Sequence, residues 1–570
     1  MKGIVSMKFS EYQYIRPNIE EAKEKLAKAI EIINNSQSVE EVTKTIDEVN
    51  VLRADIDTAA TLCSIRYSIN TVDEFYVKEQ EFFDENGPIL TSYQNEFNKA
   101  LVGCKFISEL EDKYGKKLFD SIRLELTTFS NEIIEDLQEE NKLCSKYSKL
   151  IASAKIPFDG KILNLSQFAP YTTSKVRKVR KEAEGAVWKF FEEHEEEFDN
   201  LYDSLVKVRD RMAKKLGFEN YVPLGYARLG RTDYDALMVA NYRKQVYEDL
   251  VPIVKEMIKE QGKRIGVDDM KSYDIPLDFL SGNPTPKGTT QELIEKANKM
   301  YHEMSKETGE FFDFMKEKEL MDLEAKAGKD SGGYCTYISN YKSPFIFANF
   351  NGTSGDVDVL THEAGHAFQV FSSRGFTVPE YLWPTLEACE IHSMSMEFFA
   401  WPWMKLFFED DCDKYLYSHL AGTITFIPYG VTVDEYQHEV YLHPEYTPKQ
   451  RKEVWRSIEK KYLPYKVYEN EFLDKGNYWL RQGHIFSTAF YYIDYTLAQV
   501  CAQQFWIKNQ ENHEKAWSDY YRLCCAGGSK TFLELLKVAN LKNPFVDGTV
   551  KYVASHLKEW LDKVDQEKIK

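Results

Sequence analysis

Apolar and polar residues recur with the period of an α-helix along most of the chain. The N-terminal third follows this pattern almost throughout. One of its segments opens with S-V-E-E, in which Ser38 can cap a helix and Glu41 can complete a capping box. Helices are therefore expected over residues 17–34, 38–70, 73–102 and 121–153.

The pattern changes after this third of the chain. Residues 155–168, KIPFDGKILNLSQF, alternate apolar and polar positions around Asp159 and Gly160, a pair typical of a β-hairpin turn. One very long helix is then expected, because its end is followed directly by Gly217, as in a glycine C-cap. This helix should cover residues 174–216, another should cover 234–262, and the composition of 281–288 predicts a loop.

Residues 344–352, PFIFANFNG, give the clearest strand signal, because β-forming residues lie between Pro344 and Gly352. The strand could be a sheet edge that only packs. We favour an edge strand whose free backbone groups pair with an extended peptide, because a histidine-containing helix follows at once. The candidate substrate-binding residues are Phe347, Ala348 and Asn349.

Residues 361–369, THEAGHAFQ, carry the strongest chemical signal. His362 and His366 are four residues apart, so on a helix they lie on one face, one turn apart. Together with Glu363 they form an H-E-x-x-H pattern, which offers two imidazoles to zinc and a carboxylate to its water. The alternative is a chance match on an ordinary helix. Gly365 costs a mid-helix position about 1 kcal/mol relative to alanine, which suggests that another segment packs closely there.

A catalytic zinc site needs a third protein ligand. A helical pattern over residues 380–399 contains four candidates, namely Glu387, Glu390, His392 and Glu397. Glu390 and Glu397 are seven residues apart and share a face, and Glu387 partly shares it. One carboxylate should bind the metal and another should accept a hydrogen bond from a ligand histidine. Periodicity alone leaves that assignment open.

Composition narrows the class of protein. The 570 residues are 43% hydrophobic and 14% aromatic, which is ample for a large core and more than one domain. The net charge of −18 argues against nucleic acid or an anionic membrane as partner. Nine cysteines with no C-x-x-C pair suggest neither a disulfide framework nor a thiolate metal site. The absence of a secretory signal and of any run of 18 apolar residues predicts a cytoplasmic protein.

The motifs resemble a known family. THEAGHAFQ followed by CEIHSMSMEFF is similar to the zinc peptidases of the thimet oligopeptidase and oligoendopeptidase F family. The segments SGGYCTYISNYKSPFIFANFNG, RQGHIFSTAFYYIDYTLA and CCAGGSKTFLELLKVANL also resemble it. The start, FSEYQYIRPNIEEAKEKL, is similar to the Pz-peptidase branch, known for cutting collagen-derived peptides. The resemblance covers nearly the whole chain, most specifically residues 332–536.

The resemblance assigns the metal ligands. In the family the third ligand is the first glutamate of an E-x-x-S-x-x-x-E segment, which Glu390, Ser393 and Glu397 match. One zinc ion is thus expected on His362, His366 and Glu390, with Glu397 or Glu387 supporting a ligand. Glu363 should act as the general base.

The resemblance also implies a fold. It is a mainly α architecture in which two helical lobes enclose a deep substrate channel, with a small β-sheet beside the zinc helix. We expect an N-terminal helical lobe over residues 1–180 and a catalytic lobe over 181–570, which includes connecting helices over 181–330. Such a channel would admit short peptides and exclude folded proteins.

A histidine and three tyrosines lie within twelve residues of the segment RQGHIFSTAFYYIDY. On one helix, His484, Tyr491 and Tyr495 would share a stripe, which could equally be an aromatic core stripe. The family uses such residues to bind substrate and stabilise the oxyanion. We therefore assign His484 and Tyr495 to catalysis, and Tyr491 and Tyr492 to substrate binding.

The expected function is a zinc-dependent endopeptidase that hydrolyses short oligopeptides, with collagen-derived peptides as candidate substrates. One alternative is a helix-rich zinc carboxypeptidase, for which Arg481 could hold the substrate's C-terminal carboxylate. Another is a catalytically silent, zinc-containing helical binding protein, which would have no use for Glu363.

Overall fold

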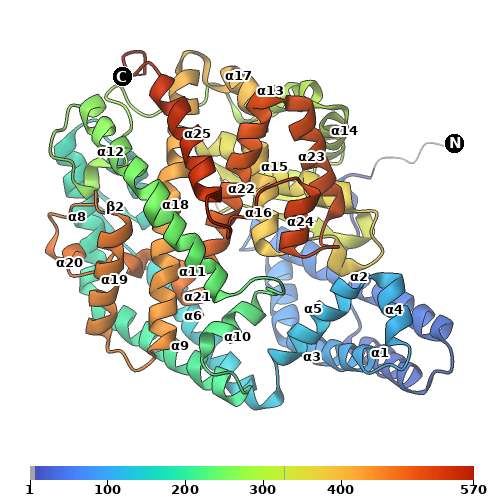
Figure 1. Cartoon of the computed structure of the whole chain (residues 1–570). Coiled ribbons are helices and arrows are strands. Elements are labelled where there is room, and N and C mark those ends of the chain that lie inside the picture. Colours follow the sequence, from blue (N-terminus) through green and yellow to red (C-terminus); the bar gives the residue numbers. More distant parts are fainter. Residues whose placement is uncertain (1–6, 327, 331, 570) are drawn as a thin grey trace. The chain divides into compact units, whose positions relative to one another are not determined.

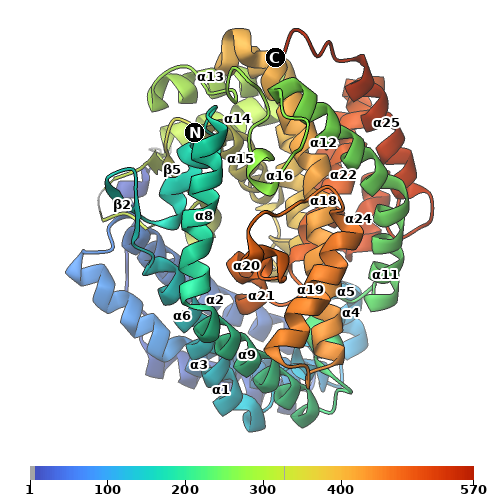
Figure 2. The same cartoon turned by 90° about the vertical axis from the view of Figure 1, so that its left-hand side faces the viewer.

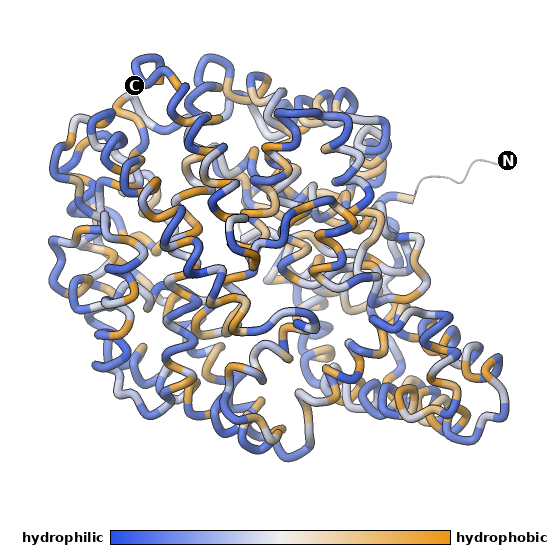
Figure 3. The backbone as a smooth tube through the Cα atoms, in the orientation of Figure 1, coloured by the Kyte–Doolittle hydropathy of each residue, from blue (hydrophilic) through white to orange (hydrophobic). Residues whose placement is uncertain are grey.

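The computed structural model describes residues 7–326, 328–330 and 332–569 (Figure 1). Helices dominate this part of the chain, and its strands form one sheet of two strands and one of three. The predicted mainly α fold is confirmed. Figure 3 shows apolar and polar positions alternating along the helices, the pattern from which they were predicted. None of the helices in the described ranges is long and apolar enough to span a membrane.

Contacts divide the chain into two compact units, each assembled from three segments. Unit 1 comprises Met1–Leu126, Thr285–Glu409 and Lys508–Leu541, and unit 2 comprises Thr127–Pro284, Asp410–Ile507 and Lys542–Lys570. Blue, yellow and red segments in Figure 1 therefore meet within unit 1. The predicted boundary at residue 180 is a different division of the chain, and it stays a prediction, as does the channel between two lobes.

The N-terminal part of unit 1 is a group of helices around an apolar core. The side-chain oxygen of Ser38 accepts a hydrogen bond from the Glu41 backbone N–H at 3.3 Å, so the predicted cap is present. Leu26, Phe97 and Phe119 belong to the core. The helices are α1 (Ile19–Asn35), α2 (Val39–Ile69), α3 (Glu74–Val102), α4 (Ile107–Tyr114) and α5 (Lys116–Thr127). The single helix predicted over 121–153 is wrong, because the chain turns between α5 and α6 (Ile134–Ala152).

Unit 1 also contains the three-stranded sheet. Its strands are β3 (Met321–Glu324), β4 (Tyr334–Ile338) and β5 (Ser343–Phe350), in the order β3-β5-β4. β5 pairs in parallel with β3 and antiparallel with β4. The strand predicted at 344–352 is confirmed, but its predicted position at an edge is wrong, because β5 is the central strand.

A helix carrying both motif histidines follows β5. This helix, α15 (Gly355–Ser373), contacts β4, β5 and the helices α16 (Leu386–Phe399) and α23 (His513–Ala526). The small sheet therefore lies beside it, as predicted. α16 begins later than predicted, since Pro384 and the extended Thr385 precede its first turn. The other helices of unit 1 are α13 (Thr290–Met304), α14 (Lys306–Glu317), α17 (Met404–Phe408) and α24 (Phe532–Val538).

Among the described residues of unit 2, the regular structure is helical apart from one hairpin (Figure 2). β1 (Ile156–Phe158) and β2 (Lys161–Leu163) pair antiparallel, with positive φ angles at Asp159 (49°) and Gly160 (70°), as the predicted turn requires. The single helix predicted over 174–216 is wrong, because His194 interrupts it and leaves α8 (Arg177–Glu193) and α9 (Glu195–Lys215). The remaining helices are α7 (Ala169–Thr172), α10 (Tyr221–Arg228), α11 (Ala236–Gln245), α12 (Val251–Ile265), α18 (Cys412–Leu442), α19 (Pro448–Tyr462), α20 (Glu471–Asp474), α21 (Gly483–Ser487), α22 (Tyr492–Glu511) and α25 (Thr549–Lys563).

Candidate metal centre

The start of α15 is held against the end of β5. The backbone N–H groups of Asn351 and Gly352 donate to the carboxylate of Asp356, at 2.9 and 2.8 Å. A carboxylate in the first turn of a helix also interacts favourably with the helix dipole. The turn from strand to helix is thereby closed, and α15 leaves the sheet in a defined direction.

Gly365 allows α16 to pack closely against α15. A Cβ atom built at this position would lie 2.6 Å from the Cα of Ser393 and 2.8 Å from the carbonyl oxygen of His392. Only glycine permits that approach. The close packing predicted from a glycine in mid-helix is therefore present, and its partner is the helix that carries Glu390.

Three side chains converge where the two helices meet. The Nε2 atom of His362 lies 3.3 Å, and that of His366 3.7 Å, from Oε2 of Glu390. One ligand atom from each residue lies within 4.8 Å of the other two. Donor atoms at about 2.0–2.2 Å from a tetrahedral zinc are themselves about 3.3–3.6 Å apart. The donor set and its spacing therefore fit a zinc ion.

Glu397 contacts the other nitrogen of the His362 ring. Its Oε1 lies 2.6 Å from Nδ1 of His362. With the Nδ1 proton donated to Glu397, the lone pair of Nε2 faces the metal position, as a ligand imidazole requires. The second candidate for this contact, Glu387, is buried in α16 one turn before Glu390, and its role stays a prediction.

The charges around this position suit a cation. Burial alone would raise the pKa of Glu390, but His362, His366 and Ser393 lower it to about 2. Ser393 donates a hydrogen bond to Oε2 of Glu390 at 3.1 Å. Burial lowers the pKa of His366 to about 4, so this imidazole is neutral at pH 7. Glu390 is thus ionised and His366 neutral, which are the forms that bind metals.

Glu363 is half-buried next to these residues. Within the described ranges its carboxylate makes no hydrogen bond to protein. Burial raises its pKa, which His362 lowers and Glu390 and Glu397 raise further. A carboxylate in this environment holds a proton more readily than an exposed glutamate does. It therefore has the environment expected of a general base.

Cys335 is a neighbour of the centre that the sequence did not indicate. This β4 residue is close enough to Glu363 for the carboxylate to raise the pKa of the thiol, although burial is the larger cause. Its position comes from the contact between β4 and α15, and no local motif marks it.

Comparison with known proteins identifies the family. The model described as Peptidase M3 N-terminal domain matches residues 9–129, and the one described as Peptidase family M3 matches residues 171–554. The chain belongs to peptidase family M3. The predicted family and the predicted peptidase are confirmed.

Individual M3 relatives agree with this assignment. An oligoendopeptidase F homolog of Borreliella burgdorferi is 23% identical over 98% of this chain and 93% of its own length. The structure of PZ peptidase A with an inhibitor is 56% identical, with a TM-score of 0.93 over 98% of this chain and 100% of its own. Oligoendopeptidase F of Enterococcus faecium shares the fold at 14% identity, with a TM-score of 0.65 over 96% and 98% of the two chains.

The predicted histidine and tyrosine cluster of this M3 peptidase lies in unit 2. The ring centroids of Tyr491, Tyr492 and Tyr495 are 5.8, 5.1 and 5.6 Å from that of His484. The hydroxyl of Tyr495 lies 3.4 Å from Nε2 of His484. The structure thus brings the four side chains together, and their catalytic roles stay predictions.

The single helix predicted through this cluster is wrong. His484 lies in α21, whereas α22 begins at Tyr492, and Phe490 between them has a φ of +67°. The Phe490 N–H donates to Oε1 of Gln437 at 2.9 Å, and its carbonyl accepts from the buried Arg231 at 2.7 Å. Tertiary hydrogen bonds therefore impose a turn that the aromatic sequence does not suggest.

The three predicted substrate-binding residues lie on the central strand of the M3 sheet. Phe347 and Ala348 are fully buried, and the ring of Phe347 stacks on Tyr334 at 4.9 Å. The side-chain amide of Asn349 donates to the carbonyl oxygens of Asp330 and Gly332, both at 2.9 Å. β3 and β4 pair with both sides of this strand, so it has no free edge with which a substrate peptide could pair.

Proposed function

We propose that this M3 peptidase is a zinc-dependent endopeptidase of short oligopeptides, with His362, His366 and Glu390 as the metal ligands. The family match and the oligoendopeptidase F relatives make the chain a metalloendopeptidase that acts on oligopeptides. One observation carries the assignment of the centre. Three donor atoms on two helices lie within 4.8 Å of one another, with the carboxylate of Glu363 alongside.

The chain's own residues prepare the reaction. Zinc, when bound, acts as a Lewis acid that makes water more acidic and polarises the carbonyl of the scissile bond. Glu397 keeps a proton on Nδ1 of His362, and Ser393 holds Oε2 of Glu390. Glu363 accepts the proton of the attacking water and delivers it to the leaving amine nitrogen. Its raised pKa makes Glu363 a stronger base for the first of these transfers.

His484 and Tyr495 are the proposed donors to the carbonyl oxygen as it becomes negative. The side-chain nitrogen of Gln482 lies 2.9 Å from Nδ1 of His484, which restrains the ring. Removing one donor to an oxyanion typically costs about 3–4 kcal/mol of transition-state stabilisation. The rings of Tyr491 and Tyr492 lie beside that of His484, and both tyrosines are proposed to contact the substrate.

An extended peptide is proposed to pair with β4 in place of β5. β4 is the outer strand on its side of the sheet, so one row of its backbone groups has no strand partner in the described sheet. β4 contacts α15, the helix that carries Glu363, and Glu363 raises the pKa of the Cys335 thiol in this strand. A peptide added along β4 would therefore pass the general base.

Chelation and a doubly blocked peptide test the proposal. The zinc-free protein should lose hydrolysis of a ten-residue peptide blocked at both termini, and one equivalent of zinc should restore it. Cleavage at an internal bond supports an endopeptidase. Hydrolysis that survives complete removal of zinc, or that only ever removes residues from the C-terminus, would contradict it.

Substrate size and source extend the proposal. A deep channel predicts that ten-residue peptides are cut far faster than casein or folded proteins, and equal rates would exclude it. Collagen-derived peptides are proposed as candidates, because the N-terminal segment resembles the Pz-peptidase branch. A cytoplasmic location is likewise a proposal.

A further inference from the structure

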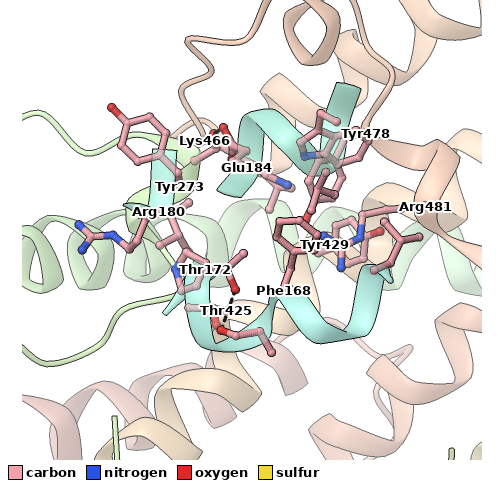
Figure 4. Close-up of a pocket in the computed structure, with 18 of the residues that line it drawn as sticks. Phe168, Thr172, Arg180, Glu184, Tyr273, Thr425, Tyr429, Lys466, Tyr478 and Arg481 are labelled. Atoms are coloured by element: carbon pink, nitrogen blue, oxygen red, sulfur yellow. Dashed lines mark hydrogen bonds between the residues drawn. The ribbon is translucent and has the colours of Figure 1, made fainter. Parts of the chain in front are cut away.

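A cavity of about 740 Å³ lies wholly within unit 2 (Figure 4). α8, α18, the segment after α19 and the turn Tyr478–Arg481 line it. Its volume is in the range of about 300–1,000 Å³ that is typical of small-ligand pockets. None of the residues assigned above to catalysis lines this cavity.

Arg481 is the cation of the cavity that has no carboxylate partner among the described residues. Its side chain is exposed, and no ion pair among the described residues includes it. The other two cations of the lining differ in this respect. Arg180 lies 2.7 Å from a carboxylate oxygen of Asp274, and Lys466 lies 3.7 Å from one of Glu459. Arg481 therefore keeps its donors available to a ligand.

The surroundings of Arg481 are aromatic. Its guanidinium carbon lies 5.6 Å from the ring centroid of Tyr478, and Nζ of Lys466 lies 3.0 Å from the same centroid. Burial raises the pKa of the Tyr478 phenol, but Lys466 and Arg481 outweigh burial and lower it. Partly exposed rings of Phe426 and Tyr429 line the same space. An anionic group beside an apolar one would fit here.

The lining residues favour an anion over a cation. Glu184 is the only carboxylate among them, and it accepts a hydrogen bond from the hydroxyl of Ser272 at 2.8 Å. The whole chain carries a net charge of −18, which repels a polyanion more strongly than a ligand with a single carboxylate. An arginine fork binds a carboxylate through two parallel hydrogen bonds.

We propose that Arg481 binds the C-terminal carboxylate of an oligopeptide in this cavity, with the last side chain against the aromatic rings. The peptide as ligand rests on the proposed function. The site would then recognise a terminus of the substrate and not the bond that is cut. It also gives Arg481 a role in an endopeptidase.

Calorimetry with matched peptides tests this site. The ligand is an eight-residue peptide ending in phenylalanine, as the free acid and as the C-terminal amide, on zinc-loaded Glu363→Gln protein. Hydrogen bonds to a charged group predict that amidation weakens binding about 10–100-fold. Arg481→Met should lower the affinity for the free acid to that for the amide, and it should leave the affinity for the amide unchanged. Arg481→Lys should fall in between.

A control variant separates loss of the carboxylate site from a general loss of positive charge. Lys142→Met removes the same charge from an exposed position of unit 2 outside the cavity, and it should change neither affinity. Equal affinity for the acid and the amide in the protein that keeps Arg481 would overturn the proposal. This comparison does not depend on whether an Arg481 variant folds. Failure of the acid to bind at all, or tighter binding of inorganic phosphate than of the acid, would also overturn it.

Turnover distinguishes this failure from failure of the proposed function. If a doubly blocked peptide is cut but acid and amide bind alike, only the carboxylate site is wrong. If no peptide is cut while binding depends on Arg481 and a free carboxylate, the endopeptidase is wrong and the site stands.

Discussion

The Nδ1 atom of His362 on α15 lies 2.6 Å from Oε1 of Glu397 on α16. Glu397→Gln should therefore weaken zinc binding about 10–100-fold, as loss of a carboxylate behind a ligand histidine does. Competition with a chelating dye measures this. Glu387→Gln is the matched comparison, because Glu387 is the other glutamate predicted for this contact. A loss of affinity in Glu387→Gln alone would reverse the assignment.

Gly365→Ala should destabilise the protein although alanine is the better helix former. The new Cβ would lie 2.6 Å from the Cα of Ser393, so α15 and α16 must separate. Overpacking of this kind costs about 1–3 kcal/mol, against about 1 kcal/mol gained in helix propensity.

A glycine in α8 provides the control for that substitution. Gly185 is exposed, and a Cβ atom there would meet no atom within 4 Å. Gly185→Ala should thus raise the thermal midpoint, whereas Gly365→Ala lowers it and also weakens zinc binding. Shifts of the same sign would show that α16 does not constrain residue 365.

Tyr495→Phe should lower kcat about 10²–10³-fold with little change in KM, if its hydroxyl stabilises the oxyanion. Tyr495 is chosen among the three tyrosines because its hydroxyl lies 3.4 Å from Nε2 of His484. Steady-state kinetics on one blocked peptide should be compared with Tyr491→Phe and Tyr492→Phe. A larger loss of kcat in either of those would transfer the role to that tyrosine.

Asp434 makes the stability of unit 2 depend on pH. Its carboxylate lies 2.5 Å from Arg243, and although burial raises its pKa, His438 and Arg243 lower it to about 2. The unfolded chain binds this proton near pH 3.9, so stability from Asp434 is full above about pH 4 and is lost toward pH 2.

Asp434→Asn isolates this contribution. The difference in free energy of unfolding between the two proteins should reach at least about 2 kcal/mol at pH 6 and shrink below pH 4. Denaturant unfolding between pH 6 and pH 3 measures it. A difference that stays constant over this interval would show that the folded-state pKa is not lowered.

Helical periodicity in the sequence was sufficient to predict part of the metal centre. His362 and His366 share a face because four residues make about one helical turn, so their proximity follows from the sequence alone. Glu390 is different. Its approach depends on Gly365 and on the packing of α16, and helical periodicity left Glu387, Glu390 and Glu397 as alternatives. The family resemblance made that choice.

Other features depend on contacts distant in sequence. An apolar run predicts that residues 344–352 form a strand, but it cannot distinguish a central strand from an edge strand. The turn at Phe490 depends on a hydrogen bond that its N–H donates to Gln437 and on one that its carbonyl accepts from Arg231, and both partners lie more than fifty residues away. The break at His194 has no proline or glycine to mark it.

Hydrolysis of a doubly blocked ten-residue peptide by zinc-loaded Glu363→Gln protein tests the metal centre most directly. The variant should keep one zinc per chain and the thermal midpoint of the unsubstituted protein, because Glu363 is not a proposed ligand. Its turnover should fall about 10²–10⁴-fold, the usual contribution of a general base. Turnover near that of the unsubstituted protein, with one zinc bound, would contradict the role of Glu363 and the reaction built on it.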